Sequence, residues 1–313
     1  MFRDFRDAQQ AASFVNPSLY RTHSFIEQRY PSFDFAGLVP VNTDGDMWDV
    51  GTLVYSGDIA GAADYIGRKA FDIPNVSVNF SQGLSNFHLA GAGYELSLGE
   101  VNRFARIITQ NPSGTASLGQ RKANAANMVA AKFVYDRAIR GSTEKNFTGL
   151  VNDARVPTAS APNGSWATAT PAQMLADVNA ALNDVIVNTK ETAMPNSLVI
   201  PTSKFLTANN AQLPNTPTSV LTFLAQNNSY TAMTKQPLDI RPSRELETAG
   251  SSGTGRMVAY EKNPDNMEFF YPGMFEFMPE FPTSSMTWRV DGVMNVGQLE
   301  IYRPKTVTYR DGL

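Results

Sequence analysis

The segment over residues 47–96 most constrains how this chain can fold, because it reads as β structure without a core of its own. Residues 48–55 form one strand candidate, and residues 76–80 alternate apolar with polar side chains, which is typical of a second strand. The intervening residues 56–74 hold three glycines and few large apolar side chains. A two-stranded hairpin is only marginally stable alone in water. We therefore expect this segment to lie on the body of the chain or on a neighbouring subunit.

The preceding residues 1–46 are rich in aromatic side chains but show no sustained helix or strand period. Six of these aromatic residues are spread through the stretch: Phe14, Tyr20, Phe25, Tyr30, Phe33 and Phe35. The pattern favours an extended arm laid on another surface, so that removing residues 1–40 should weaken assembly more than folding. The alternative is an irregular N-terminus packed on its own domain.

Two helices are predicted next, each opened by the same capping signal. Ser97 is followed three residues later by Glu100, and Ser117 is followed by Gln120. The second pair opens a long helix over 117–140, roughly 36 Å at 1.5 Å per residue. Its polar face carries one acidic residue, Asp136, against five basic ones: Arg121, Lys122, Lys132, Arg137 and Arg140. This basic face is either solvated or in contact with a packed anionic partner.

From residue 147 onward the pattern is that of an α+β domain. A third capping box, Thr170 to Gln173, predicts a helix to about residue 188. Near the end, residues 288–291 and 298–303 alternate apolar with polar side chains and predict strands. Because the helices at 97–140 need a sheet to cover, we expect this terminal segment to pair with strands near 80–96.

The run over residues 271–282 is dense in Phe and Met but interrupted by Pro and Glu. One interpretation is a core strand flanked by turns. The other is a patch between subunits, since Met and aromatic residues are enriched at interfaces.

The composition and the missing motifs exclude most kinds of catalytic, metal and phosphate-binding site. The chain has no cysteine, two histidines and a net charge of -3, so thiolate metal sites are excluded and sequence-specific nucleic-acid binding is disfavoured. No phosphate-binding glycine loop occurs, and the run at 42–46 lacks the ligand spacing of a calcium loop. No apolar run is long enough for a membrane span, and the first residues do not form a secretory signal. We predict no enzyme activity, no cofactor, no metal and a cytoplasmic site of synthesis.

Short motifs follow one another in an order that resembles the major capsid proteins of tailed bacteriophages, with the Hong Kong 97-type fold. The matching stretches are 71–78, 98–103, 117–122, 149–152, 198–203, 257–260 and 275–277. The resemblance implies an α+β fold whose parts are the N-terminal arm (1–46), an extension loop formed by a β-hairpin (47–80), a peripheral domain (81–149) with a spine helix (117–140), an axial domain (150–284) and return strands of the peripheral domain (285–313).

The resemblance also implies a function. Such a protein self-assembles as hexamers and pentamers into the icosahedral shell that encloses a double-stranded DNA genome. It implies a separate scaffold, a portal and a decoration protein as partners, only non-specific contact with packaged DNA, no membrane contact, and a place in the virion after assembly in the host cytoplasm. The alternatives are an encapsulin-like bacterial compartment, another virion protein of the tail or decoration type, and an unrelated metabolic enzyme.

Two sets of residues are candidates for a role in such a shell. The candidates for contact between subunits are Phe2, Phe5, Phe14, Tyr20, Trp48, Tyr55, Tyr65, Arg68, Lys69, Phe275 and Phe277. Some relatives crosslink through a lysine of the extension loop, but no acceptor position can be matched to Lys69, so no crosslink is predicted. The candidates for an inward-facing basic surface are Arg121, Lys122, Lys132 and Arg140.

Overall fold

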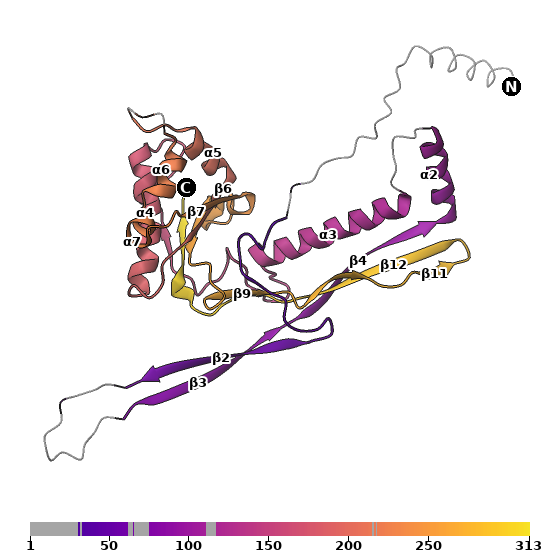
Figure 1. Cartoon of the computed structure of the whole chain (residues 1–313), viewed down its shortest axis with the longest axis horizontal. Helices are drawn as coiled ribbons and strands as arrows, with labels where there is room; N and C mark the ends of the chain where they lie inside the picture. Colours follow the sequence, from indigo (N-terminus) through magenta and orange to yellow (C-terminus); the bar gives the residue numbers. More distant parts are fainter. Residues whose placement is uncertain are drawn as a thin grey trace, which may run out of the picture. The chain divides into compact units, whose positions relative to one another are not determined.

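The computed structural model describes residues 31, 33–61, 65, 75–110, 117–214, 216 and 218–313 (Figure 1). Two compact units can be distinguished. Among the described residues, the first unit is built mainly from 92–128 and 277–292, and the second from 33–91, 129–276 and 293–313. The boundaries fall inside four elements: the helix α3 (Leu118–Arg140) and the strands β4 (His88–Ser97), β10 (Gly273–Phe277) and β12 (Thr287–Val296).

Both predicted capping signals open helices, α2 (Leu98–Gln110) and α3. The Oγ of Ser97 accepts a hydrogen bond from the N–H of Glu100 at 3.2 Å. The Oγ of Ser117 accepts one from the N–H of Gln120 at the same distance. These bonds satisfy backbone donors that have no partner within the first helical turn. The predicted positions of both helices are confirmed.

The helix α3 ends at a turn that only glycine can make. Gly141 has a φ of +64°, in the left-handed region. A Cβ at this position would lie 2.2 Å from the carbonyl oxygen of Phe147. The residue therefore stops the helix and lets the chain fold back closely on it.

The strand β12 is shared by all pairings of a four-stranded sheet. The strands β10, β11 (Phe281–Ser284) and β4 each pair with it. In the first unit, β11 runs antiparallel to β12, and Phe281 lies opposite Arg289. A Cβ on Gly93 of β4 would lie 2.9 Å from the carbonyl oxygen of Val290. This close approach of the two backbones requires a residue without a side chain.

The predicted pairing of the terminal segment with strands near 80–96 is confirmed for residues 288–291, because they lie in β12, which pairs with β4. It is wrong for residues 298–303. The strand β13 (Leu299–Ile301) pairs antiparallel with β9 (Met267–Phe270), and β9 also pairs with β1 (Val41–Asn42). Leu299 and Ile301 are fully buried in the first core cluster. An alternating pattern shows that one face of a strand is covered, but it does not identify the neighbouring strand.

The end of the predicted arm packs on the chain's own core. The ring of Phe35 lies 5.7 Å from that of Phe269, and the hydroxyl of Tyr260 donates to the carbonyl of Leu38 at 2.5 Å. Leu38 and Val39 are buried in the first core cluster. For residues 33–42 the alternative of packing on the same domain is therefore correct. The other four aromatic residues of the arm, Phe14, Tyr20, Phe25 and Tyr30, lie outside the described residues.

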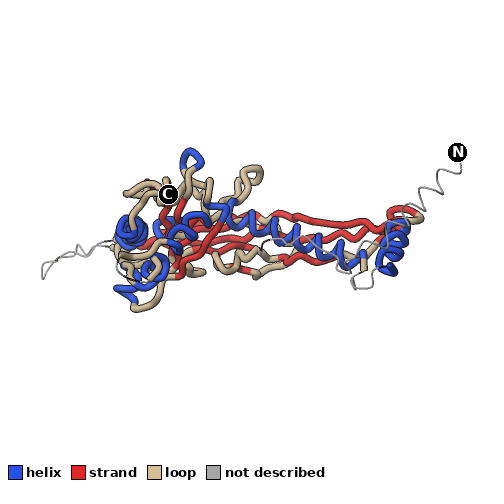
Figure 2. Tube along the Cα trace, turned by 90° about the horizontal axis from the view of Figure 1, so that it is seen from above, coloured by secondary structure: helices blue, strands red, loops and turns tan. Residues whose placement is uncertain are grey.

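A five-stranded mixed sheet organises the rest of the second unit. Its order is β5 (Thr158–Ser160), β14 (Val307–Asp311), β8 (Arg256–Tyr260), β6 (Ser197–Pro201) and β7 (Asp239–Ser243). The helices around this sheet are α4 (Pro171–Asn188), α5 (Thr202–Asn210), α6 (Val220–Gln226) and α7 (Ser229–Thr234), which Figure 1 labels. Figure 2 draws helices in blue and strands in red near the marked C-terminus. The capping box of Thr170 and Gln173 opens α4 as predicted. The second core cluster lies between α4 and the strands β6 and β8.

The strand β14 lies between β5 and β8, in the sheet formed by residues of the expected axial domain. Val307 and Tyr309 are fully buried. At its end, Arg256 bonds Asp311 through Nε and Oδ1 at 2.7 Å and lies 4.5 Å from the centre of the Tyr309 ring. Burial alone would raise the pKa of Asp311, but hydrogen bonds from Arg256 and from the N–H of Ser251 outweigh burial and hold that pKa below its usual value.

We expect Asp311→Asn to lower the free energy of unfolding by about 2 kcal/mol or more, because Arg256 would keep a buried charge without its partner. Only 13% of the Arg256 side chain is exposed. Urea denaturation measures the loss. The matched control is Asp291→Asn, whose partner Arg289 is 48% exposed. Equal losses in the two variants would contradict the expectation.

The difference in stability between the parent chain and Asp311→Asn depends on pH. Because the pKa of Asp311 is lowered in the folded state, its contribution is complete above the usual carboxyl pKa of about 3.9. It is lost as the pH falls through the lower folded value. The difference in stability between the parent chain and Asp311→Asn should therefore shrink at acidic pH.

Candidate assembly surface

The strands β2 (Gly51–Ala60) and β3 (Ser77–Asn86) form a two-stranded antiparallel ribbon (Figure 1). All ten residues of each strand are in register, from Gly51 opposite Asn86 to Ala60 opposite Ser77. Among the described residues, no third strand pairs with the ribbon. The predicted strands are confirmed, and β3 continues beyond residue 80, where the extension loop was expected to end.

One face of the ribbon is apolar. In an antiparallel pair, residues directly opposite each other point to the same face. Leu53 lies opposite Leu84 and Ile59 opposite Val78. The large apolar side chains of this face are between 50% and 82% exposed: Leu53, Tyr55, Ile59, Val78, Phe80 and Leu84. We call these six residues the apolar ribbon face.

The opposite face of the ribbon is polar. Ser56 and Ser81 face each other, and their hydroxyl oxygens lie 2.6 Å apart. Thr52 pairs with Ser85 on the same face. The ribbon is therefore amphipathic with the period of two that strands require, and its apolar side has no cover within the described residues.

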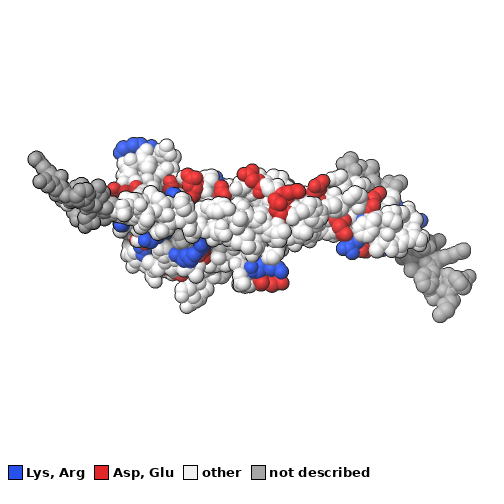
Figure 3. Space-filling model, turned by 90° about the horizontal axis from the view of Figure 1, so that it is seen from below, with Lys and Arg blue, Asp and Glu red and all other residues white. Residues whose placement is uncertain are grey.

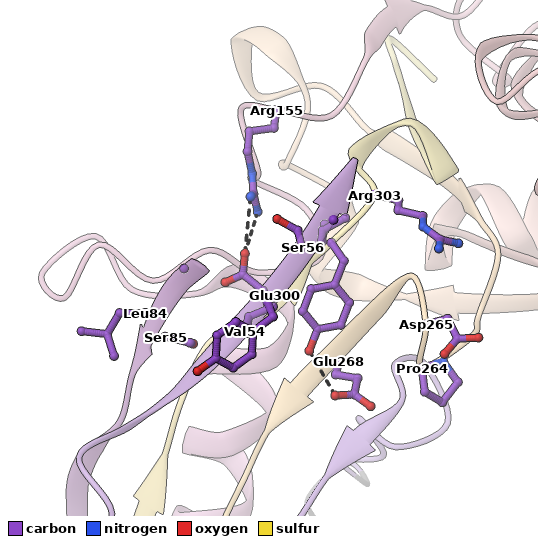
Figure 4. Close-up of a pocket in the computed structure, with 15 residues that line it drawn as sticks. Val54, Ser56, Leu84, Ser85, Arg155, Pro264, Asp265, Glu268, Glu300 and Arg303 are labelled. Carbon is purple, nitrogen blue, oxygen red and sulfur yellow. Dashed lines mark hydrogen bonds and ion pairs between the residues drawn. The ribbon is translucent and has the colours of Figure 1, made fainter. Parts of the chain in front are cut away.

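A pocket of about 700 Å³ lies beside the ribbon, lined by residues of β2 and β3 and by residues around β9 and β13 (Figure 4). Arg155 contacts Asp153 at 2.8 Å and Glu300 at 3.3 Å. The hydroxyl of Tyr302 donates to Glu268 at 3.1 Å. Burial, and then the charge of Glu268, raise the pKa of Tyr302 above its usual value. These charged groups satisfy one another, and the described residues contain no cluster of three His, Asp or Glu that could hold a metal.

The predicted contact residues are distributed over several elements. Trp48, Tyr55 and Tyr65 are exposed. Phe275 is partly buried against the first core cluster, and its N–H donates to the hydroxyl of Tyr271 at 2.9 Å. The ring of Phe277 lies in the first unit. The remaining candidates lie outside the described residues: Phe2, Phe5, Phe14, Tyr20, Arg68 and Lys69.

In the first unit, Phe277 and two members of the predicted basic surface contact the chain itself. The Phe277 ring lies 5.8 Å from that of Tyr94. The guanidinium of Arg121 lies 5.5 Å from the centre of the Phe104 ring. Lys122 pairs with Glu100 at 2.8 Å, and this hydrogen bond is the main reason that the pKa of Glu100 is lowered.

In the second unit, Arg140 pairs with Glu245 at 2.5 Å. Lys132 is exposed and forms no ion pair with the described part of the chain. Contacts within the chain therefore engage three of the four predicted basic residues. On the face drawn in Figure 3, acidic and basic side chains lie in small separate groups on a largely uncharged surface.

Sequence reasoning had missed five of the six residues of the apolar ribbon face as contact candidates: Leu53, Ile59, Val78, Phe80 and Leu84. The alternation over residues 76–80 had pointed to two of them, Val78 and Phe80. The pairing register supplies the missing information, because it brings the two strands' apolar positions to one face. Among the described helices, none has the length and apolar content needed to cross a bilayer.

The fold matches those of several solved capsid structures. It is similar to the capsid of Myoviridae phage XM1, with a TM-score of 0.78 and 15% identity over 95% of this chain and 98% of that chain. It is also similar to a structure from Mycobacterium phage Bobi, with a TM-score of 0.62 and 11% identity over 96% and 97%. A virus-like particle from Pyrococcus furiosus gives a TM-score of 0.51 and 11% identity over 87% and 90%. These likenesses show the Hong Kong 97-type fold.

The family model described as major capsid protein matches residues 61–313. The chain belongs to the major capsid protein family. No curated protein matches its sequence. The resemblance inferred from the motifs is thereby confirmed, both for the α+β capsid fold and for the family of tailed-phage capsid proteins, and an encapsulin-like compartment is not favoured.

We expect the triple substitution Leu53→Ser, Ile59→Ser and Phe80→Ser to abolish most particle formation while changing the free energy of unfolding of the monomer little. The three side chains are exposed in the single chain, but each would contribute about 1.5 kcal/mol or more if a neighbour buried it. Particle yield by gradient sedimentation and monomer stability by urea denaturation test this. The control is Ser56→Ala with Ser81→Ala on the polar face. A normal particle yield from the triple variant would contradict the assignment of the apolar ribbon face to contacts between copies.

Proposed function

We propose that copies of this chain assemble as hexamers and pentamers into the icosahedral shell that encloses the double-stranded DNA of a tailed bacteriophage. Besides family membership, the observation that carries this proposal is the apolar ribbon face, which the described residues leave exposed. A folded chain gains about 25 cal/mol for each Å² of apolar surface that a neighbour buries. Repeated around a closed shell, that gain stabilises the assembly rather than the monomer.

In this proposal the parts of the chain have different roles. The loop at 47–80 and the arm at 1–46 reach other copies, with Trp48, Tyr55 and Tyr65 among their contact residues. The axial domain at 150–284 points toward the fivefold and sixfold axes. The peripheral domain at 81–149, with its return strands at 285–313, carries the spine helix. No step of this role requires catalysis, a cofactor or a metal.

Packaged DNA meets the shell through non-specific contacts only. A strongly basic lining would bind phosphate tightly and resist release, whereas the net charge of this chain is -3. Lys132 is the member of the proposed inward surface that no ion pair engages within the described residues. A shell structure in which Lys132 points outward would overturn this part of the proposal.

The proposal includes partners that the chain itself does not contain. These are a separate scaffold, a portal and a decoration protein. The shell forms in the host cytoplasm and remains in the virion. An encapsulin-like compartment, which the comparisons do not favour, is kept only as an outcome of the following test.

Expression of the complete chain, followed by sizing and cryo-electron microscopy, tests assembly. We expect closed shells with pentamers and hexamers. Particles isolated from phage lysates should absorb strongly at 260 nm, as expected for packaged nucleic acid. Shells that hold protein and no nucleic acid would favour the compartment. A chain that remains monomeric in both preparations would refute both functions.

Removing residues 1–30 should weaken assembly and leave the unfolding midpoint unchanged, because this cut spares the segment packed on the core. Removing residues 1–40 also deletes Leu38 and Val39, which are buried. That loss should cost about 3 kcal/mol or more of stability. The deletion of residues 1–30 is therefore the proper test of the arm. Thermal unfolding measures the loss of stability and particle yield measures the loss of assembly, so together they separate the two effects. If both deletions lowered the unfolding midpoint equally, the interpretation of residues 1–30 as an arm that contacts other copies would be contradicted.

A further inference from the structure

A small pocket lies between the C-terminal half of α3 and the start of β4, within the second unit. Its volume is about 130 Å³. The apolar part of its lining consists of Leu89, Ala90, Phe133, Phe147 and Val296. An apolar cavity of about 150 Å³ holds one benzene molecule. The pocket therefore has room for a single phenyl ring.

The walls of the pocket are held in place by contacts within the chain. The ring of His88 stacks on that of Phe147, with the two centroids 5.2 Å apart. The guanidinium of Arg137 lies 4.6 Å from the centre of the Phe133 ring. The backbones of Ser142 and Phe147 exchange two hydrogen bonds, at 2.8 and 2.9 Å. Because the pocket already has its shape, binding costs little entropy for ordering these side chains.

One buried polar group of the lining has no partner in the described part of the chain. Ser142 is only 7% exposed, and its backbone is paired with Phe147. Its hydroxyl forms no hydrogen bond with the described residues. A hydroxyl both donates and accepts, and buried hydroxyls normally have a partner. The hydroxyl of Ser142 is therefore an independent indication that the pocket receives a ligand with a polar group.

The charged residues of the lining carry an excess of positive charge. Arg137 and Lys145 stand against one acid, Glu144, and none of the three forms an ion pair with the described residues. The guanidinium of Arg137 is fixed at one end, because its Nη1 donates to the carbonyl of Gly141 at 2.9 Å. Its other N–H groups remain able to bind a carboxylate, which a guanidinium does with well-defined geometry.

We propose that this pocket binds an acidic segment of a separate protein. One phenylalanine ring of that segment enters the pocket, the carboxylates beside the ring bind Arg137 and Lys145, and the hydroxyl of Ser142 bonds the backbone of the segment. A ring in a preformed pocket, with charged groups around it, is the arrangement in which a few residues supply most of the binding energy. The inference adds a partner site to the proposed shell function and does not depend on it.

Two other occupants fit the pocket less well. A nucleotide would place the donors and acceptors of its base edge against an apolar lining, where most of them would stay unpaired. A second copy of this chain offers Trp48, which is 64% exposed within the acidic run 46–49, but an indole is larger than the single ring that the pocket holds. The aromatic rings of 33–35 and 275–277, which also flank an acid, contact the chain itself.

The probe for the test is an unlabelled, capped peptide of sequence Asp-Glu-Phe-Glu-Asp, titrated into the complete chain by calorimetry. We expect saturable binding. Replacing the phenylalanine of the peptide with alanine should weaken binding by about tenfold or more, because the pocket then stays empty. Replacing the four acids with their amides should weaken it by a similar factor, because the charge-assisted bonds are lost.

Variants of the chain separate binding from folding. Arg137→Gln combined with Lys145→Gln should weaken binding of the acidic peptide by about tenfold. The matched control is Glu144→Gln, which should strengthen binding, because it removes the one acid of the lining. Ala90→Leu should abolish binding by filling the pocket. Urea denaturation confirms that each variant folds, and a purely structural role would not shift the affinity in opposite directions.

Absence of binding by the acidic peptide would overturn the inference, as would equal binding of the phenylalanine and alanine peptides or unchanged binding by Ala90→Leu. Tighter binding of a capped peptide with the sequence of residues 46–49 would identify a second copy as the occupant. Tighter binding of a single-stranded oligothymidylate would identify a nucleic acid. Either of these two results would also overturn the inference. Because the titration does not measure assembly, its failure would leave the proposed shell function intact.

Discussion

Within the described residues the two-stranded ribbon has no layer beneath it, and the rest of the structure depends on that constraint. The chain places its apolar side chains on one face of β2 and β3 and its serines and threonine on the other. Water hydrates the exposed Ser56 and Ser81 of the polar face, but the apolar face gains nothing until another surface covers it. The folding free energy of the single chain therefore comes from its two core clusters, whereas the ribbon contributes mainly when copies associate.

Several charged side chains form ion pairs within the chain. Arg256 and Asp311 fasten β14 to β8, Lys122 and Glu100 join the first turns of α3 and α2, and Arg140 holds Glu245. Ion pairs that close within one copy are not available to a neighbour. By contrast, the apolar ribbon face and the run over residues 205–234 contain no charged residue. Such surfaces give adhesion that depends weakly on ionic strength.

Local signals in the sequence predicted the helices well, and long-range pairing was where prediction failed. The capping boxes at Ser97, Ser117 and Thr170 act through bonds three residues apart, so they can be recognised directly. The alternation at 298–303 identified a strand but not its neighbour, which is β9. Likewise, Leu53 and Leu84 share a face only because of a register that neither strand specifies alone. The aromatic residues of the arm also did not reveal that Phe35 packs on Phe269.

The place of β14 has a consequence for synthesis. Residues 307–311 insert between β5 and β8, whose residues leave the ribosome much earlier. Until they arrive, β5 has no partner in the sheet, and one edge of β8 stays open. A chain cut short by premature termination would therefore lack a finished second unit. Translation itself thus delays the moment at which a new copy becomes fit to join its neighbours, and it keeps fragments out of the growing lattice.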